Sequence, residues 1–240
     1  MPVAITANLA GEPGLSPQIT MGTIGHEACP VVIVDNFVSN PDAVRDAAVR
    51  LEWARLGDYY PGPRAPVEQS YLIAITPVLR AVLTKAFGLS AGAEVLRCYY
   101  SLATSLPAEL ELAQRIPHVD AYYPEQVAMV HYLCPAVLGG TNFYRHRATG
   151  FERIDEPRSR IYHAALSADF AAGGEPPPSY IGESSPYFEC IGGCDAVYNR
   201  AVFFPGNLLH CAALDGVALP ASPLVGRLTI AAFIRPSARP

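Results

Sequence analysis

The stretch Val95-Leu96-Arg97-Cys98-Tyr99-Tyr100 marks the point in the chain that sets the fold class. Its β-branched and aromatic residues favour a strand, whereas the ninety residues before it are mostly helical in pattern. Similar short runs follow, separated by Gly and Pro corners. They predict eight strands, near residues 94–104, 113–119, 127–134, 141–147, 186–192, 199–204, 208–213 and 227–234. This pattern is typical of a jelly roll or related double-sheet barrel, so we expect a mainly β protein with flanking helices.

The first ninety residues predict elements that pack around this barrel. Residues 1–30 carry Gly, Pro, Ser and Thr without a clear period and predict a loosely ordered leader. A buried strand at 31–34 is followed by a helix over 40–55, which the N-cap Asn40 and the first-turn Pro41 open. A second helix is predicted over 70–87, before Gly88. We expect these N-terminal helices to pack on one sheet.

The domain organisation follows from length and from these elements. With 240 residues, of which 50% are hydrophobic, the chain can bury a sizeable core. We expect a leader and then a single domain over residues 31–240, with its barrel core at about 94–234. A helical insertion at about 155–180 interrupts the strands, where a lid or substrate loop could sit.

Composition excludes several classes of partner. A net charge of -5 gives no basic field for nucleic acid. The N-terminus lacks an export signal, and no apolar run approaches the roughly 18 residues that span a bilayer. We therefore expect a cytoplasmic protein with no membrane partner, in which the six cysteines are free thiols. The pair Cys190 and Cys194 has no second pair at zinc-finger spacing.

The stretch Arg115-Ile116-Pro117-His118-Val119-Asp120 carries the first candidate chemistry. It places an imidazole and a carboxylate two residues apart in a segment predicted to be extended. Since the side chains of a strand alternate, His118 and Asp120 would lie on one face. One more ligand would complete a metal site, and His210 is the candidate in the last apolar third. Two imidazoles and a carboxylate hold iron(II) with three positions open.

These residues resemble a known motif. His118-x-Asp120, the distal His210 and Arg227-x-Thr229 are similar to the metal and co-substrate motif of the iron(II) and 2-oxoglutarate-dependent dioxygenases. The run 127–133 and the double glycine of Gly139-Gly-Thr-Asn-Phe143 resemble the prolyl-hydroxylase-like branch. Residues 115–120 together with 139–150 are more similar still to a bacterial family, DUF6445, that is placed near these oxygenases. The resemblance covers about residues 94–234.

The resemblance implies cofactors and a reaction. Fe(II) would be held by His118, Asp120 and His210 as the catalytic centre, with 2-oxoglutarate as co-substrate and O2 as oxidant. The implied reaction hydroxylates a substrate and releases succinate and CO2. Halogenases of this kind replace the carboxylate ligand by Gly or Ala, so Asp120 favours hydroxylation. Desaturation and ring closure remain open.

The resemblance also implies an anchor for the co-substrate. Arg227 and Thr229 would hold the C5 carboxylate of 2-oxoglutarate, because a buried guanidinium needs a carboxylate partner. Arg227 follows His210 by seventeen residues, so residues 211–226 are expected to form an enlarged turn. Other candidate groups are the alternative anchors Arg235, Arg200 and Arg97, and the phenols of Tyr99, Tyr100 and Tyr132.

The remaining histidines and the cysteine beside the site have simpler interpretations. His131 lies in the middle of a predicted strand and is a packing residue or a rival to His210 as ligand. Taken alone, His210 could be a core histidine. His146, His163 and His26 are expected at the surface or in the pocket, and Cys211 as a small buried residue.

A cluster after the double glycine bears on the substrate. Tyr144-Arg145-His146-Arg147 is either a solvated edge strand or a substrate site beside the iron. Two arginines there, with Arg115, favour a substrate bearing carboxylate or phosphate. The candidate substrate residues are therefore Arg115, Tyr144, Arg145 and Arg147, and the candidate substrate is an amino acid, a peptide or a small acidic metabolite.

The sequence thus predicts a double-stranded β-helix acting as an Fe(II)- and 2-oxoglutarate-dependent hydroxylase. The alternatives are a non-catalytic cupin-like module that binds a metal or ligand, and a 2-oxoglutarate-independent metalloenzyme on the same fold. The expected partner is a small molecule or peptide, and a homodimer is left open.

Overall fold

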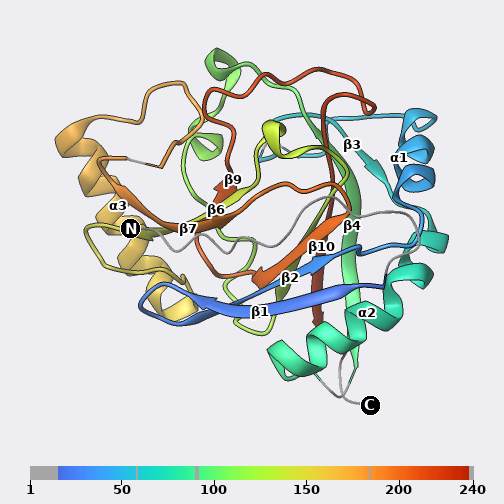
Figure 1. Ribbon diagram of the computed structural model, residues 1–240. Coiled ribbons are helices and arrows are strands. Elements are labelled where there is room, and N and C mark those ends of the chain that lie inside the picture. The colour runs from blue at the N-terminus through green and yellow to red at the C-terminus, as the bar shows by residue number, and fades with distance from the viewer. Residues whose placement is uncertain (1–15, 58, 90–91, 184, 238–240) are drawn as a thin grey trace.

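The computed structural model describes residues 16–57, 59–89, 92–183 and 185–237. In this part of the chain the protein is mostly β, with two antiparallel sheets and three α-helices (Figure 1). The larger sheet has the order β1-β2-β8-β5-β10-β4-β3. Its strands are β1 (Gln18–Ile24), β2 (Cys29–Asp35), β8 (Arg200–Pro205), β5 (Val127–Tyr132), β10 (Arg227–Pro236), β4 (Ala93–Ala103) and β3 (Arg64–Pro66). The smaller sheet has the order β7-β6-β9, formed by β7 (Phe188–Cys194), β6 (Thr141–His146) and β9 (His210–Ala212).

The two faces of the larger sheet bury different cores, as strand alternation predicts. On β10, Leu228 and Ile230 lie in the main core together with residues of the N-terminal helices. The opposite face contributes Tyr132 and Val202 to a second core, which also contains Phe143 of the smaller sheet. Polar side chains at the end of this inner face, such as Thr229, therefore lie between the sheets.

The two N-terminal helices cover the outer face of the larger sheet. Helix α1 (Pro41–Val49) begins at Asn40, whose side chain accepts a hydrogen bond from the Ala43 N–H. Helix α2 (Gln69–Phe87) ends at Gly88, which adopts the left-handed conformation that glycine favours. The sequence prediction of both helices is confirmed, although α1 is shorter than expected.

Helix α2 is the one described helix that is long and apolar enough to span a membrane by length and composition. The expectation that no apolar run approaches this length is thus not met. One face of the helix nevertheless packs in the main core, where Tyr71, Ile75, Leu79, Val82 and Leu83 are buried.

Seven of the eight strands predicted from residue 94 onward are present, and one is not. Residues 113–119 form the end of a 3-10 helix (Leu112–Gln114) and then a loop, with one isolated bridge at His118. Two strands were missed. Strand β1 lies within the expected leader and pairs with β2 along its whole length, while residues 1–15 lie outside the described part. The short β3 pairs with β4 at the other edge of the sheet.

The predicted helical insertion is α3 (Glu156–Gly173), on the side of the molecule away from α1 and α2 (Figure 1). The Asp155 carboxylate caps its first turn by accepting from the Arg158 N–H at 3.0 Å. Its Tyr162 and Leu166 form a small core with Ile116 and Val119 of the loop that carries His118. Helix α3 therefore supports the candidate metal-binding loop from one side.

Candidate metal centre and its surroundings

His118 and Asp120 come from a loop rather than from a strand, which corrects the expected origin of their geometry. The main chain of this loop is held at two places. His118 and His210 exchange both backbone hydrogen bonds, at 2.9 and 3.0 Å, and the Asp120 N–H donates to the Gly206 carbonyl at 2.7 Å. These bonds, rather than strand alternation, turn the two side chains toward β9.

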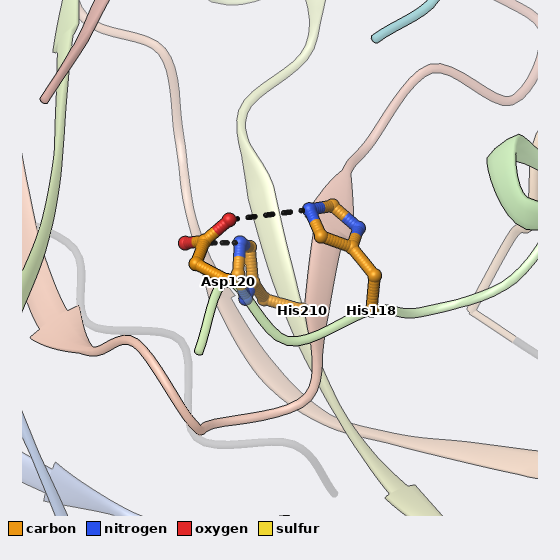
Figure 2. A group of neighbouring side chains, drawn as sticks. All are labelled: His118, Asp120 and His210. Atoms are coloured by element: carbon orange, nitrogen blue, oxygen red, sulfur yellow. Dashed lines mark ion pairs between the residues drawn. The ribbon is translucent and has the colours of Figure 1, made fainter. Parts of the chain in front are cut away.

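The side chains of His118, Asp120 and His210 converge on one point (Figure 2). Their ligand atoms all lie within 4.8 Å of one another. The Asp120 carboxylate lies between the imidazoles, with Oδ1 3.7 Å from His118 Nε2 and Oδ2 3.4 Å from His210 Nε2. Neighbouring ligands of one ion, each about 2.1 Å from it, would be separated by about 3 Å. The cluster is therefore close to the spacing that a metal requires.

The His210 ring is oriented by a main-chain contact. Its Nδ1 lies 2.8 Å from the Leu208 carbonyl, which can only accept, so Nδ1 carries the proton and Nε2 is left as a lone-pair donor. The Phe204 ring packs edge-on against the imidazole, with 4.5 Å between centroids. Burial lowers the pKa of His210 to about 4, so the ring is neutral at pH 7. Neutral imidazole is the form that binds metals.

The other two members of the cluster complete its electrostatics. Partial removal of its ring from water, followed by the adjacent His210, lowers the pKa of His118. Burial raises the pKa of Asp120 to about 6, against the lowering effect of His118 and Arg64. Among the described residues this carboxylate has no Lys or Arg within 4.0 Å, only the two neutral imidazoles, and a divalent cation would supply the missing close countercharge. Because the His118 side chain is 46% exposed, the cluster is accessible from solvent on that side.

His131 does not belong to this cluster, and its interpretation as a packing residue is confirmed. The buried ring accepts a hydrogen bond at Nδ1 from the Tyr71 hydroxyl at 3.0 Å, and Nε2 donates to Asn199 Oδ1 at 3.2 Å. The Asn199 amide in turn donates to the Val38 carbonyl. Both ring nitrogens are thus engaged within the core beneath α2.

Arg227 lies on the inner face of β10, as expected, with its side chain buried. Its guanidinium is held by the double-glycine turn, because Nη2 donates to the Gly140 carbonyl at 2.8 Å and Nε to the Gly139 carbonyl at 3.3 Å. The charge also lies 6.0 Å from the centre of the Tyr132 ring. Strand β10 begins at Arg227, so the expected enlarged turn after His210 is present.

The other predicted co-substrate groups lie nearby. Thr229 is buried two residues further along β10 and stands opposite Ser101 on one side and Tyr132 on the other. The Tyr132 hydroxyl pairs with Thr141 Oγ1 at 2.6 Å. Tyr99 lies on the same face of β4 as Ser101. Tyr100 points to the other face, into the main core, and its hydroxyl donates to the Val44 carbonyl.

Two of the alternative anchors are committed to carboxylates elsewhere. Arg200 pairs with Asp35 at 2.7 Å, and Arg235 pairs with Glu94 near the end of the sheet. Arg97 is exposed on β4.

The expected substrate residues are engaged within the protein. Arg145 forms ion pairs with the fully buried Glu152 and with Glu189, and the Tyr144 hydroxyl donates to the Gly182 carbonyl at 3.1 Å. Arg147 Nε donates to the Ser185 carbonyl at 3.0 Å. Arg115 donates to the Leu110 carbonyl at 2.8 Å and to Pro176 at 3.4 Å. The charge of Arg145 is thus already neutralised, which removes much of the reason for expecting an acidic substrate there.

The family model of DUF6445, a family of unknown function, matches residues 15–234. The chain belongs to the DUF6445 family. The predicted family resemblance is therefore confirmed, and it extends further toward the N-terminus than the motifs alone suggested. No curated protein matches this DUF6445 chain.

Solved structures of low sequence identity share the fold of the DUF6445 protein. HygX from Streptomyces hygroscopicus with nickel, 2-oxoglutarate and hygromycin B bound is 11% identical, with a TM-score of 0.52. That similarity covers 88% of this chain and 84% of the HygX chain. HygX with iron bound is 10% identical with a TM-score of 0.52, covering 90% of this chain and 88% of that one.

Sequence reasoning missed two residues near the candidate metal and co-substrate groups of the DUF6445 protein, Arg64 and the Tyr60 that packs against it. Arg64 lies on β3 opposite Ser101, and its guanidinium carbon lies 4.5 Å from the centre of the Tyr60 ring. The charge of Arg64 lowers the pKa of both Asp120 and His118. Residues 59–63 had the composition of a loop, and β3 is three residues long, so no periodic pattern could indicate where the side chains of this segment lie.

Proposed function

We propose that the protein is an Fe(II)- and 2-oxoglutarate-dependent oxygenase that hydroxylates a small molecule and releases succinate and CO2. The observation that carries the proposal is the convergence of His118, Asp120 and His210 at one end of the space between the sheets. We also propose that the two sheets form a double-stranded β-helix. The inner face of the larger sheet and Phe143 of the smaller sheet share one core, which supports that arrangement.

The residues present suit iron(II). Two imidazoles and one carboxylate occupy three positions of an octahedral ion and leave three for other ligands. The Leu208 carbonyl holds His210 with Nε2 directed at the cluster, and the buried Asp120 supplies the negative charge. When bound, the iron would supply the site for reaction of O2 with the co-substrate. The HygX structures with nickel or iron bound share the fold, which supports this choice of metal.

The residues beside the cluster suit a dicarboxylic acid. Arg227 is buried without a carboxylate partner among the described residues, and its two hydrogen bonds to carbonyls use Nε and Nη2. Its Nη1 group therefore remains for the distal carboxylate of 2-oxoglutarate, with the Thr229 hydroxyl beside it. The chain's own residues would bind the co-substrate at one end and orient the metal at the other.

A small-molecule substrate is part of the proposal. HygX was solved with the small molecule hygromycin B, and the 46% exposed His118 leaves the metal cluster accessible from solvent. Arg145 is paired with Glu152 and Glu189, so the arginine cluster gives less reason to expect an acidic substrate. An amino acid, a peptide or a small acidic metabolite is therefore one candidate substrate among small molecules in general.

An anaerobic titration tests the proposal. Iron(II) and then 2-oxoglutarate are added to the purified protein, and the weak visible charge-transfer band of the chelate is recorded. We expect the band to appear with 2-oxoglutarate and succinate to form slowly once air is admitted. Metal binding without the band would favour a cupin-like module, while substrate oxidation without succinate would favour a 2-oxoglutarate-independent enzyme. Either result would overturn the proposal.

A further inference from the structure

Six buried side-chain polar atoms lack a hydrogen-bond partner among the described residues, and three of them lie close together at β3 and β4. They are Tyr60 Oη, Arg64 Nε and Ser101 Oγ. Buried polar groups are nearly always paired, because an unpaired one loses its hydration without compensation. One such atom could be an isolated defect, but three in one place indicate a site built for a ligand.

The sheet register shows that these atoms share the inner face. Arg64 stands opposite Ser101 on β4, and Ser101 stands opposite Thr229 on β10. The side chains of Arg64, Ser101 and Thr229 thus form a row across three neighbouring strands. The Tyr60 ring lies against the Arg64 guanidinium. The Tyr60 hydroxyl lies beside Thr229 and Arg227 but forms no hydrogen bond with either residue.

The charges in this region are two cations without a matching pair of anions. Neither Arg64 nor Arg227 has a carboxylate within 4.0 Å in the described part of the chain. The charge of Arg64 lowers the pKa values of Asp120 and His118. The charges of Arg227 and Arg64 both act to lower the pKa of Tyr60, against the raising effect of burial. The Tyr60 ring lies 4.5 Å from the Arg64 guanidinium carbon and packs in the small core that contains Ala103, which stands opposite Arg227, so the order is Arg64, Tyr60 and Arg227. A molecule with two carboxylates, one beside the metal and one remote from it, matches this order.

We propose that Tyr60 and Arg64 belong to the 2-oxoglutarate site. In this arrangement the Arg64 guanidinium donates from Nε to the carboxylate beside the metal, and the Tyr60 hydroxyl donates to the distal carboxylate together with Arg227. The inference rests on the proposed function, and it adds two positioning residues from the segment before β4. The dicarboxylate would satisfy the unpaired atoms of both residues.

The experiment compares two ligands on matched variants of the full-length, iron(II)-loaded protein under anaerobic conditions. The ligands are 2-oxoglutarate and 2-oxobutanoate. The second has the carboxylate that would lie beside the metal but lacks the distal carboxylate. The variants are Tyr60→Phe, which removes only a hydroxyl, and Arg64→Gln. The controls are Tyr59→Phe at a side chain that is 78% exposed, and Arg80→Gln on the exposed side of α2. The charge-transfer band reports affinity, and circular dichroism with thermal unfolding reports folding.

The two variants should differ in which ligand they lose. We expect Tyr60→Phe to weaken 2-oxoglutarate by about tenfold and to leave 2-oxobutanoate unchanged. We expect Arg64→Gln to weaken both ligands by about tenfold to a hundredfold, since the lost bond is charge-assisted. Both controls should bind like the unaltered protein.

Three outcomes would overturn the inference. If the unaltered protein gives the band and both variants match it, the two residues lie outside the co-substrate site while the proposed function stands. If Arg64→Gln weakens 2-oxoglutarate alone, Arg64 serves the distal carboxylate and the proposed division is wrong. If the iron-loaded, unaltered protein gives no band, the proposed function fails and the inference fails with it.

Discussion

His118 and His210 exchange both of their main-chain hydrogen bonds, so two residues ninety-two positions apart form one antiparallel bridge. Their rings stand 4.5 Å apart on the same side of this bridge. The bridge fixes the separation of two metal-ligand candidates through the backbone, which is stiffer than any side-chain contact. Asp120 is then placed by its own backbone bond to Gly206.

Metal affinity should depend on His118 and not on a histidine outside the cluster. We expect His118→Ala to lower the affinity for nickel(II) or iron(II) by at least about a hundredfold, because one of three ligands is lost. The free energy of unfolding should change by less than about 0.5 kcal/mol, since the side chain is half exposed. Isothermal titration checks this, with His26→Ala as the matched exposed control. Equal affinities in the two variants would contradict the assigned site.

Metal affinity should also fall in acid with a midpoint set by Asp120. Its pKa of about 6 is above, and the His210 pKa of about 4 is below, the ordinary values. A proton therefore competes for Asp120 first, and we expect nickel(II) affinity to be constant above about pH 7 and to fall about tenfold per pH unit below pH 6. Titrations between pH 5 and 8 measure it. The variant Asp120→Asn should bind weakly and lose this pH dependence, and a flat profile in the unaltered protein would argue against the assignment.

The buried His131 should control acid stability without affecting the metal. Burial lowers the pKa of His131 to about 3 in the folded protein. In the unfolded chain the same histidine takes up a proton near pH 6.5, its ordinary pKa. The stability from neutral His131 is complete above about pH 6.5 and is lost on acidification, at up to about 1.4 kcal/mol per pH unit. Urea unfolding of the metal-free protein should therefore show a shallower acid slope in His131→Gln. Unchanged slopes, or reduced nickel(II) affinity in this variant, would contradict the packing role.

The hydrogen bond from Tyr71 to His131 gives a separate prediction. Tyr71→Phe leaves the buried His131 Nδ1 without its donor, and we expect a loss of about 1–2 kcal/mol in the free energy of unfolding. Urea unfolding at pH 7 measures the loss. The exposed Tyr59→Phe serves as control and should lie within about 0.5 kcal/mol of the unaltered protein. A comparable loss in both variants would point to a general effect of removing a phenol.

Glu152 should be one of the most sensitive charged positions. Its carboxylate is fully buried and accepts from Arg145 and from the N–H groups of His26 and Glu27. We expect Glu152→Gln to cost about 3 kcal/mol of stability, because it removes the charge of a fully buried carboxylate that pairs with the partly buried Arg145. Glu189 is half exposed and pairs with the same guanidinium. We expect Glu189→Gln to lower the free energy of unfolding by less than about 1 kcal/mol. Similar losses at the two positions, measured by urea unfolding, would show that burial does not set the strength of this network.

The sequence by itself determined which residue types were available and where most elements lie. The alternation of β10 assigned Leu228 and Arg227 to opposite faces, and the caps of α1 and α2 marked helices that the structure contains. These features are local, because the side-chain period and the capping residues lie within one segment. The family and the metal-ligand candidates were likewise readable from short motifs.

Only the tertiary structure decided how distant segments meet. It replaced the expected strand at His118 by a looped bridge to His210, and it paired Arg145 with Glu152 instead of leaving it for a substrate. It also brought Tyr60 and Arg64, from a segment without a periodic pattern, to the row that contains Thr229. The physical reason is that burial and charge pairing depend on packing between segments far apart in the chain, and neither the period of one segment nor its composition carries that information.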